Sequence, residues 1–191
     1  MATFNSTGSG GNANADATWA EAGQPAAGDH VIITSGDTVT LTAAEEWGSV
    51  SILGTLAGGS GYTLTLNDGG DAQIFNHDGI ITGNVDVTII GTTSRQIDLA
   101  PTGGGSGNIR TLIINRPSGT PTFLLYGSGT HGCTTLTITA GELACDSSYG
   151  DLTVSGDVSV TGTLTGNAAA ISMGSLTIES GGTYSATSGT T

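Results

Sequence analysis

One short phrase recurs four times in the second half of the chain: Thr111-Leu112-Ile113-Ile114, Thr135-Leu136-Thr137-Ile138, Asp151-Leu152-Thr153-Val154 and Ser175-Leu176-Thr177-Ile178. In each copy a leucine is followed two positions later by Ile or Val, which is typical of a strand with one buried face. The leucines are 24, 16 and 24 residues apart, or about 21 on average. Strands returning at this period predict a solenoid, because each coil can bury its apolar face only against the coils above and below.

The same alternation continues toward the N-terminus, as in Thr38-Val39-Thr40-Leu41 and Val85-Asp86-Val87-Thr88-Ile89. Glycine pairs and asparagines separate these runs, and both residue types suit the positive-φ corners of a coil. A β-sandwich or barrel would also alternate, but there we expect unrelated strands joined by two-residue hairpins. A parallel β-helix therefore explains the recurring phrase better.

The predicted fold is an all-β, right-handed parallel β-helix of roughly seven rungs with an N-terminal cap. Residues 1–28 are rich in Gly, Asn and Ala and show no alternation, so we expect them to form a cap or attachment segment with Trp19 as its plug. The solenoid is predicted over residues 29–182. Residues 183–191 are predicted to form a polar C-terminal tail.

The start of the predicted solenoid carries a more specific pattern. Trp19 is followed by Pro25-Ala26-Ala27-Gly28-Asp29-His30-Val31-Ile32-Ile33, and a second run begins at Gly48-Ser49-Val50-Ser51-Ile52. This region, about residues 17–66, resembles the G8-type entry of right-handed parallel β-helix proteins found in phage virions and on bacterial surfaces. The resemblance implies a fold and supplies no catalytic residue.

The charge of the chain limits the kinds of molecule that it can bind. The chain of 191 residues has 3 Lys and Arg against 16 Asp and Glu, a net charge of −13. Nucleic acids and anionic membranes need clustered cations, so we expect neither as a partner. No apolar run approaches the roughly 18 residues that span a bilayer. The N-terminus lacks the basic and apolar regions of a secretory leader, so we expect synthesis without one.

The two cysteines, Cys133 and Cys145, form no disulfide framework. Three hypotheses remain open for them: buried small apolar residues, a single disulfide, or redox or metal chemistry.

Possible calcium ligands are Asp68, Asp71 and Asp78, since oxygen ligands on adjacent corners suit Ca²⁺. Asp-Gly pairs are equally ordinary turn chemistry, and the spacing of calcium-binding β-rolls is absent. We therefore predict no metal, no cofactor and no catalytic residue. Arg95, Asp98 and Arg110 are expected to form a surface ion-pair ladder on neighbouring rungs. The histidines have no metal-ligand spacing.

Exposed aromatic side chains could contact a partner or a glycan, and the candidates are Trp47, Tyr62, Tyr126 and Tyr149. Two functional hypotheses follow. In the first, the chain is a non-enzymatic structural protein of a virion surface, a capsid decoration or fibre module that forms a homotrimer and binds other virion proteins. In the second, it is a carbohydrate-binding adhesin or polysaccharide-depolymerising domain at a bacterial extracellular surface, an inference from fold analogy.

Overall fold

The computed structural model describes residues 1–8, 10–68, 72–101, 107–116, 122–127, 129–146, 150–167 and 169–186. Two candidates from the sequence, Asp71 and Tyr149, lie outside these ranges. The described residues are built almost entirely of β-strands, with one short 3-10 helix, η1 (Asp16–Thr18).

Each of the two sheets contains nine strands within the described residues, and neighbouring strands in both sheets run parallel. In spatial order, the first sheet contains β1 (Thr3–Asn5), β3 (His30–Ile33), β6 (Ser49–Ile52), β8 (Gln73–His77), β10 (Arg95–Asp98), β12 (Thr122–Leu125), β14 (Glu142–Asp146), β16 (Thr163–Asn167) and β18 (Thr183–Ala186). The second contains β17 (Ile171–Ile178), β15 (Asp151–Val160), β13 (Thr130–Ala140), β11 (Ile109–Asn115), β9 (Ile80–Ile89), β7 (Thr55–Leu66), β4 (Thr38–Leu41) and β2 (Gly10–Asn12), and β5 (Glu45–Trp47) also pairs with β7.

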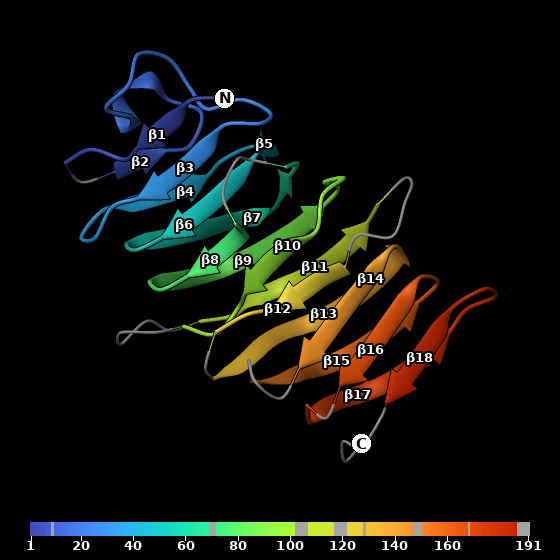
Figure 1. Ribbon diagram of the computed structural model, residues 1–191. Helices are drawn as coiled ribbons and strands as arrows, with labels where there is room; N and C mark the ends of the chain where they lie inside the picture. Colours follow the sequence, from blue (N-terminus) through green and yellow to red (C-terminus); the bar gives the residue numbers. More distant parts are fainter. Residues whose placement is uncertain are drawn as a thin grey trace.

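The chain passes from one sheet to the other and back, so it coils around a shared core (Figure 1). From β3 to β17 the described residues contain seven strand pairs, one for each rung, and the chain makes about six turns from the first rung to the last. The predicted parallel solenoid is confirmed.

Aliphatic side chains fill the space between the sheets in continuous columns. One column contains Leu64, Val87, Leu112, Leu136, Val158 and Leu176, which are register partners from rung to rung. The first five of these side chains are at most 1% exposed, whereas Leu176 is 37% exposed. Each residue is thus buried by the rung that follows it, and in the described residues no strand follows β17 in its sheet.

The four copies of the recurring phrase do not all lie in one column. Leu112, Leu136 and Leu176 belong to the column above, but Leu152 pairs with His131 and Ile171 in another column. The reason is that β13 and β15 shift register partway along their length, so one strand carries two separate Leu/Val patterns. Val158 occupies the position in β15 that corresponds to Leu136.

The sheets extend beyond both limits of the predicted solenoid, residues 29–182. At the N-terminal end, β1 pairs with β3 and β2 with β4, and at the other end β18 pairs with β16. Trp19 is buried at the N-terminal end, where its ring meets Phe4 and Trp47 edge to face at centroid distances of 6.4 and 6.1 Å. A capping role for residues 1–28 stays a prediction.

Candidate functional site

The aromatic residues proposed as partner or glycan contacts differ in exposure. Trp47 is fully buried under the N-terminal rungs, so its ring cannot reach a ligand at the surface, and the contact expected for it does not fit this position. The reason is that Trp47 is the last residue of β5 and faces inward, where it is in register with the buried Leu66. Tyr62 is partly buried against the core. Tyr126 is exposed, and a contact role for Tyr126 and Tyr62 stays a prediction.

The possible calcium ligands Asp68 and Asp78 are used for local hydrogen bonds. The carboxylate of Asp68 accepts hydrogen bonds from the backbone N–H and the hydroxyl of both Thr92 and Thr93, one rung away. Burial opposes the charged form, but these four hydrogen bonds outweigh it and lower the pKa of Asp68 to about 2. Asp78 accepts a hydrogen bond from Asn76 at 3.0 Å. In the described residues, no three His, Cys, Asp or Glu side chains form a group that could hold a metal ion.

The arginines do not form the predicted ladder. Arg110 pairs with Asp86 through two hydrogen bonds, which lower the pKa of that carboxyl. Arg116 is buried, and its Nε donates to the carbonyl of Gly91. Arg95 pairs with neither Asp98 nor any other described residue. The prediction failed because the side chains of Arg95 and Asp98, three residues apart, point to opposite sides of β10. Asp98 is buried and lies beside His131.

Several acidic side chains join consecutive rungs in the same way as Asp68. Their partners lie 18 to 24 residues away, which is about one turn of the solenoid. These contacts are Glu46 with Asn67, Asp86 with Arg110, Glu142 with Thr165, Asp151 with the N–H of Ala170, and Asp157 with Ser175. Outer polar groups therefore reinforce the stack that the aliphatic columns form inside.

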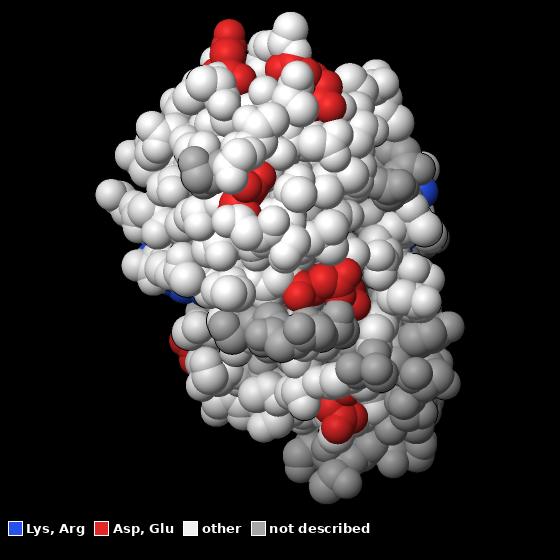
Figure 2. Space-filling view, turned by 90° about the vertical axis from the view of Figure 1, so that its left-hand side faces the viewer, with Lys and Arg blue, Asp and Glu red and all other residues white. Residues whose placement is uncertain are grey.

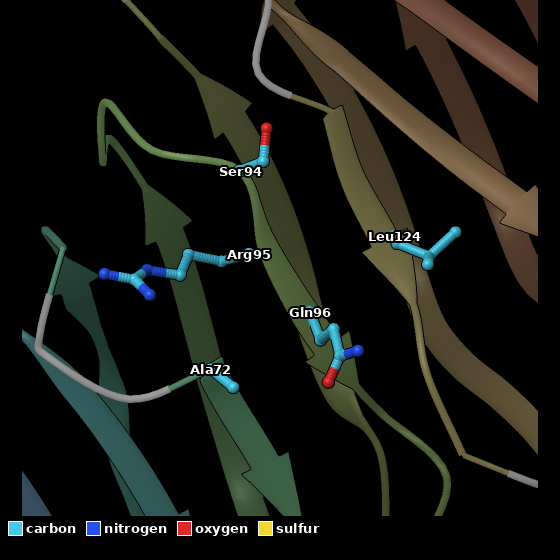
Figure 3. Close-up of a pocket in the computed structure, with 5 residues that line it drawn as sticks. All are labelled: Ala72, Ser94, Arg95, Gln96 and Leu124. Carbon is cyan, nitrogen blue, oxygen red and sulfur yellow. The ribbon is translucent and has the colours of Figure 1, made fainter.

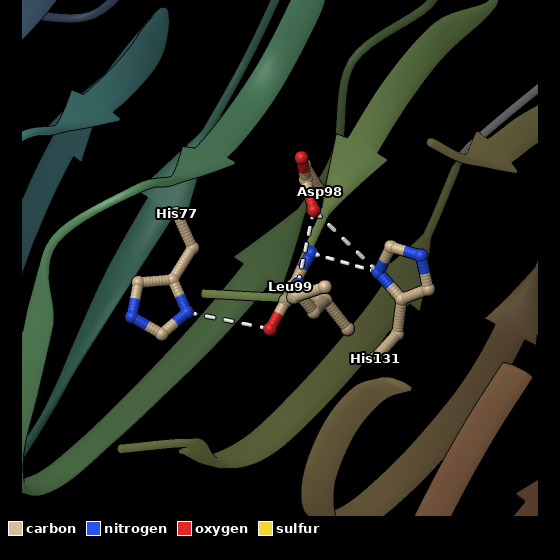
Figure 4. Close-up of polar contacts among 5 residues, drawn as sticks. His77, Asp98, Leu99 and His131 are labelled. Atoms are coloured by element: carbon tan, nitrogen blue, oxygen red, sulfur yellow. Dashed lines mark hydrogen bonds and ion pairs between the residues drawn. The ribbon is translucent and has the colours of Figure 1, made fainter. Parts of the chain in front are cut away.

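Buried polar side chains also gather at one corner of the solenoid, where the sequence spacing gave no sign of a cluster (Figure 4). His77 Nδ1 lies 3.3 Å from the carbonyl oxygen of Leu99, and the N–H of Leu99 donates to His131 Nδ1 at 3.1 Å. Asp98 accepts from the N–H of Ala100 at 3.0 Å and lies 3.7 Å from His131 Nδ1. Burial raises the pKa of Asp98.

This corner is unsuited to catalysis on a substrate. Because His131 Nδ1 accepts a hydrogen bond from a backbone N–H, the neutral ring carries its proton on Nε2. His77, Asp98 and His131 are at most 4% exposed, so nothing in solution reaches them. The two imidazoles instead satisfy the carbonyl and the N–H of Leu99, which would otherwise be buried without partners.

Both cysteines are free and buried, Cys133 in β13 and Cys145 in β14. Burial raises the pKa of each thiol to about 12, which keeps it protonated and unreactive at neutral pH. Of the three hypotheses, buried small apolar residues fit this arrangement.

The surface has a hollow lined by both polar and apolar residues. It measures about 440 Å³ and is lined by Ala72, Ser94, Arg95, Gln96 and Leu124. Ala72 directly precedes β8 and Ser94 directly precedes β10, whereas Arg95 and Gln96 begin β10 and Leu124 lies in β12. Figure 3 shows the Arg95 side chain extending from β10 toward the Ala72 side, whereas Gln96 and Leu124 lie on the other side.

Charge is distributed without a basic patch on the face shown in Figure 2, where acidic residues are scattered among uncharged ones and basic residues show only at the margins. No helix within the described ranges has the length and hydropathy needed to span a bilayer.

No protein-family model, curated protein or solved structure matches this chain significantly. The resemblance of residues 17–66 to G8-type entry segments therefore stays a prediction.

Proposed function

We propose that this protein is a non-enzymatic structural protein of a virion surface, a decoration or fibre module that acts as a homotrimer. One observation carries the proposal: the ionisable side chains of successive rungs are largely engaged in holding the rungs together. Aliphatic columns stabilise the solenoid from inside, and hydrogen bonds between rungs stabilise it from outside. A rod built in this way is suited to bearing mechanical load and to holding a binding surface rigid.

The polar corner supports the same proposal. Its histidines and Asp98 have the residue types of a proton relay, but they are closed to solvent. The histidines are bonded to the backbone of Leu99, and Asp98 accepts from the N–H of Ala100. Composition adds a second argument, because a lysine-free chain with a net charge of −13 repels nucleic acid at long range, which favours a place on the outside of a particle over a genome-binding one.

Two measurements test the proposal. Native mass spectrometry of the purified chain should give the mass of three copies. Antibodies raised against the chain should label the surface of particles released from cells that produce it, as seen by electron microscopy. A monomer in solution together with unlabelled particles would overturn the proposal.

A matched pair of variants sharpens the test. Tyr126 is exposed and Phe75 is fully buried, so Tyr126→Ala should weaken trimer formation or particle binding while the melting temperature changes little. Phe75→Leu should lower the melting temperature without a specific effect on assembly. The alternative function, binding or cleavage of surface glycans, stays a prediction. Release of reducing ends from a bacterial polysaccharide would favour it over the structural role.

A further inference from the structure

The hydrogen bonds of the polar corner are compatible with only one protonation state of His131. The N–H of Leu99 donates to His131 Nδ1 at 3.1 Å, so this nitrogen carries no proton. His77 Nδ1 lies 3.3 Å from the carbonyl oxygen of Leu99, which can only accept, so this nitrogen carries one. A second proton on His77 therefore leaves its bond to Leu99 intact. A second proton on His131 removes the acceptor of the Leu99 N–H.

Asp98 stands where it can accept the proton that His131 would gain. Its Oδ1 lies 3.7 Å from His131 Nδ1, which is too far for a hydrogen bond, and accepts from the N–H of Ala100 at 3.0 Å. A small rotation of a protonated ring would close this gap and form an ion pair. The corner thus has two arrangements, a neutral ring bonded to Leu99 and a charged ring paired with Asp98 (Figure 4).

The other ionisable groups near this corner are mostly acidic. Burial raises the pKa of Asp98 most, and the negative charge of Asp78 on the preceding rung adds to this effect, whereas His131 lowers it. On the following rung, Asp146 ends β14 and Asp151 begins β15, where Asp151 accepts from the N–H of Ala170. The position in β15 that is in register with His131 holds the apolar Leu152.

The neighbouring thiols do not compete for the proton, because burial raises the pKa of Cys133 and of Cys145 to about 12 and keeps both protonated. The carboxylates of Asp98 and Asp78 favour a charged imidazole, and burial of the ring opposes it. Imidazole is the side chain that ordinarily changes its charge between about pH 5 and pH 8, so this balance is decided in that range.

The segment that carries Tyr126 packs directly against this corner. The N–H of Tyr126 donates to the carbonyl of Ile97 at 2.9 Å. A Cβ at Gly127 would lie 2.5 Å from Asp98 Oδ2, so the backbone there rests on the carboxylate. A movement of Asp98 toward His131 therefore changes the support of an exposed aromatic side chain.

We propose that His131 is a pH-sensitive switch in the corner that follows β10. When its Nδ1 takes up a proton from solvent during local opening, the ring releases the N–H of Leu99 and pairs with the carboxylate of Asp98. The switch does not depend on the structural role proposed above, because it requires neither a trimer nor a particle.

NMR spectroscopy of the nitrogen-15-labelled full chain at about pH 7.5 and about pH 5 tests the proposal, since imidazole titrates between these values. At the higher pH, His131 should carry a proton on Nε2 alone, and at the lower pH on both ring nitrogens. The hydrogen-exchange protection factor of the Leu99 amide should then fall at least about 10-fold, because a buried N–H loses its acceptor. The amide of Leu112, in the central column, should keep its protection, and the change should reverse when the pH is raised.

Three variants connect the response to the residues. In His131→Gln the side-chain oxygen can accept from the N–H of Leu99 and does not titrate, so the protection of Leu99 should become independent of pH. His77→Gln, the matched control on the other side of Leu99, should keep the pH response. Asp98→Asn should move the response to lower pH, because it removes the charge that stabilises the imidazolium. Melting temperatures at the higher pH establish that each variant is folded.

Three results would overturn the proposal: a His131 Nδ1 that stays without a proton at about pH 5, unchanged protection of Leu99 while the ring is protonated, or the same loss of protection in folded His131→Gln. Loss of protection at Leu112 together with Leu99 would also overturn it, because this would indicate global unfolding by acid. The first two results come from the wild-type chain, so they decide the proposal even if His131→Gln does not fold.

Discussion

Asp68 and Asp98 should respond in opposite directions to the same substitution, aspartate to asparagine. In Asp68 the hydrogen bonds from Thr92 and Thr93 favour the charged carboxylate. In Asp98 burial favours the neutral acid. Asparagine is neutral and nearly isosteric, so it removes a stabilising charge at the first position and an unfavourable one at the second.

The magnitude at Asp68 follows from its pKa. The value falls from 3.8 to about 2 on folding, and at about 1.4 kcal/mol per pKa unit this corresponds to at most about 2.5 kcal/mol. Asp68 is partly exposed and solvent screens the interaction, so we expect about 1 kcal/mol at pH 7. Asp68 has a φ of 54°, a conformation that asparagine tolerates as well as aspartate does, so Asp68→Asn introduces no additional backbone strain.

Urea denaturation of both variants, followed by circular dichroism, provides the assay. Asp68→Asn should lower the free energy of unfolding by about 1 kcal/mol and the melting temperature by about 2–4 °C. Asp98→Asn should leave stability unchanged or raise it, because an asparagine oxygen can still accept from the N–H of Ala100. Because the pKa of Asp68 is lowered on folding, its contribution is complete above pH 3.8 and is lost as the pH falls through about 2. Equal destabilisation by both variants, or an Asp68→Asn deficit that persists at pH 2, would refute this explanation.

Four further outcomes are expected. Trp47→Ala should lower the free energy of unfolding by about 3–5 kcal/mol, measured in urea, because it empties the largest fully buried site. Cys133 and Cys145 should not react with a thiol reagent such as dithionitrobenzoate at neutral pH until denaturant is added, as their buried thiols have pKa values of about 12. Arg95→Met should raise the midpoint of urea denaturation by the equivalent of about 1 kcal/mol, since it removes the buried Nε, which has no hydrogen-bond partner among the described residues. Arg110→Gln should change that midpoint little, because the Arg110 side chain is exposed and its ion pair with Asp86 is screened.

The solenoid could be predicted from sequence because its signal is local and repeated. Alternation within a strand shows which side chains face inward, and the return of similar strands at coil spacing shows that they stack. Register could not be predicted in the same way. Leu152 and Leu136 have similar neighbours in sequence but occupy different columns, because β13 and β15 shift register between their two halves.

The candidate residues were harder to predict because burial depends on the neighbouring rungs. Trp47 follows two glutamates and has the sequence context of a surface corner, yet it lies inside against Trp19. His77 and His131 are far apart in the chain and meet at Leu99 because they stand on nearby rungs at the same corner. Contacts of this kind depend on how many residues each coil contains, and the coils of this chain differ in length.

Once the register of a solenoid is known, each residue can be compared with its partners in the neighbouring rungs. This comparison identifies polar residues that lie in otherwise apolar columns. His77 pairs in register with Ile52, His131 with Leu152, and Arg95 with Phe123. The two histidines are explained by the fold, since each satisfies a backbone group of Leu99. The Nε of Arg95 has no hydrogen-bond partner among the described residues, and the side chain extends toward Ala72 (Figure 3). Polar residues in apolar columns therefore fall into two groups: the histidines, which the fold explains through Leu99, and Arg95, whose Nε finds no acceptor among the described residues.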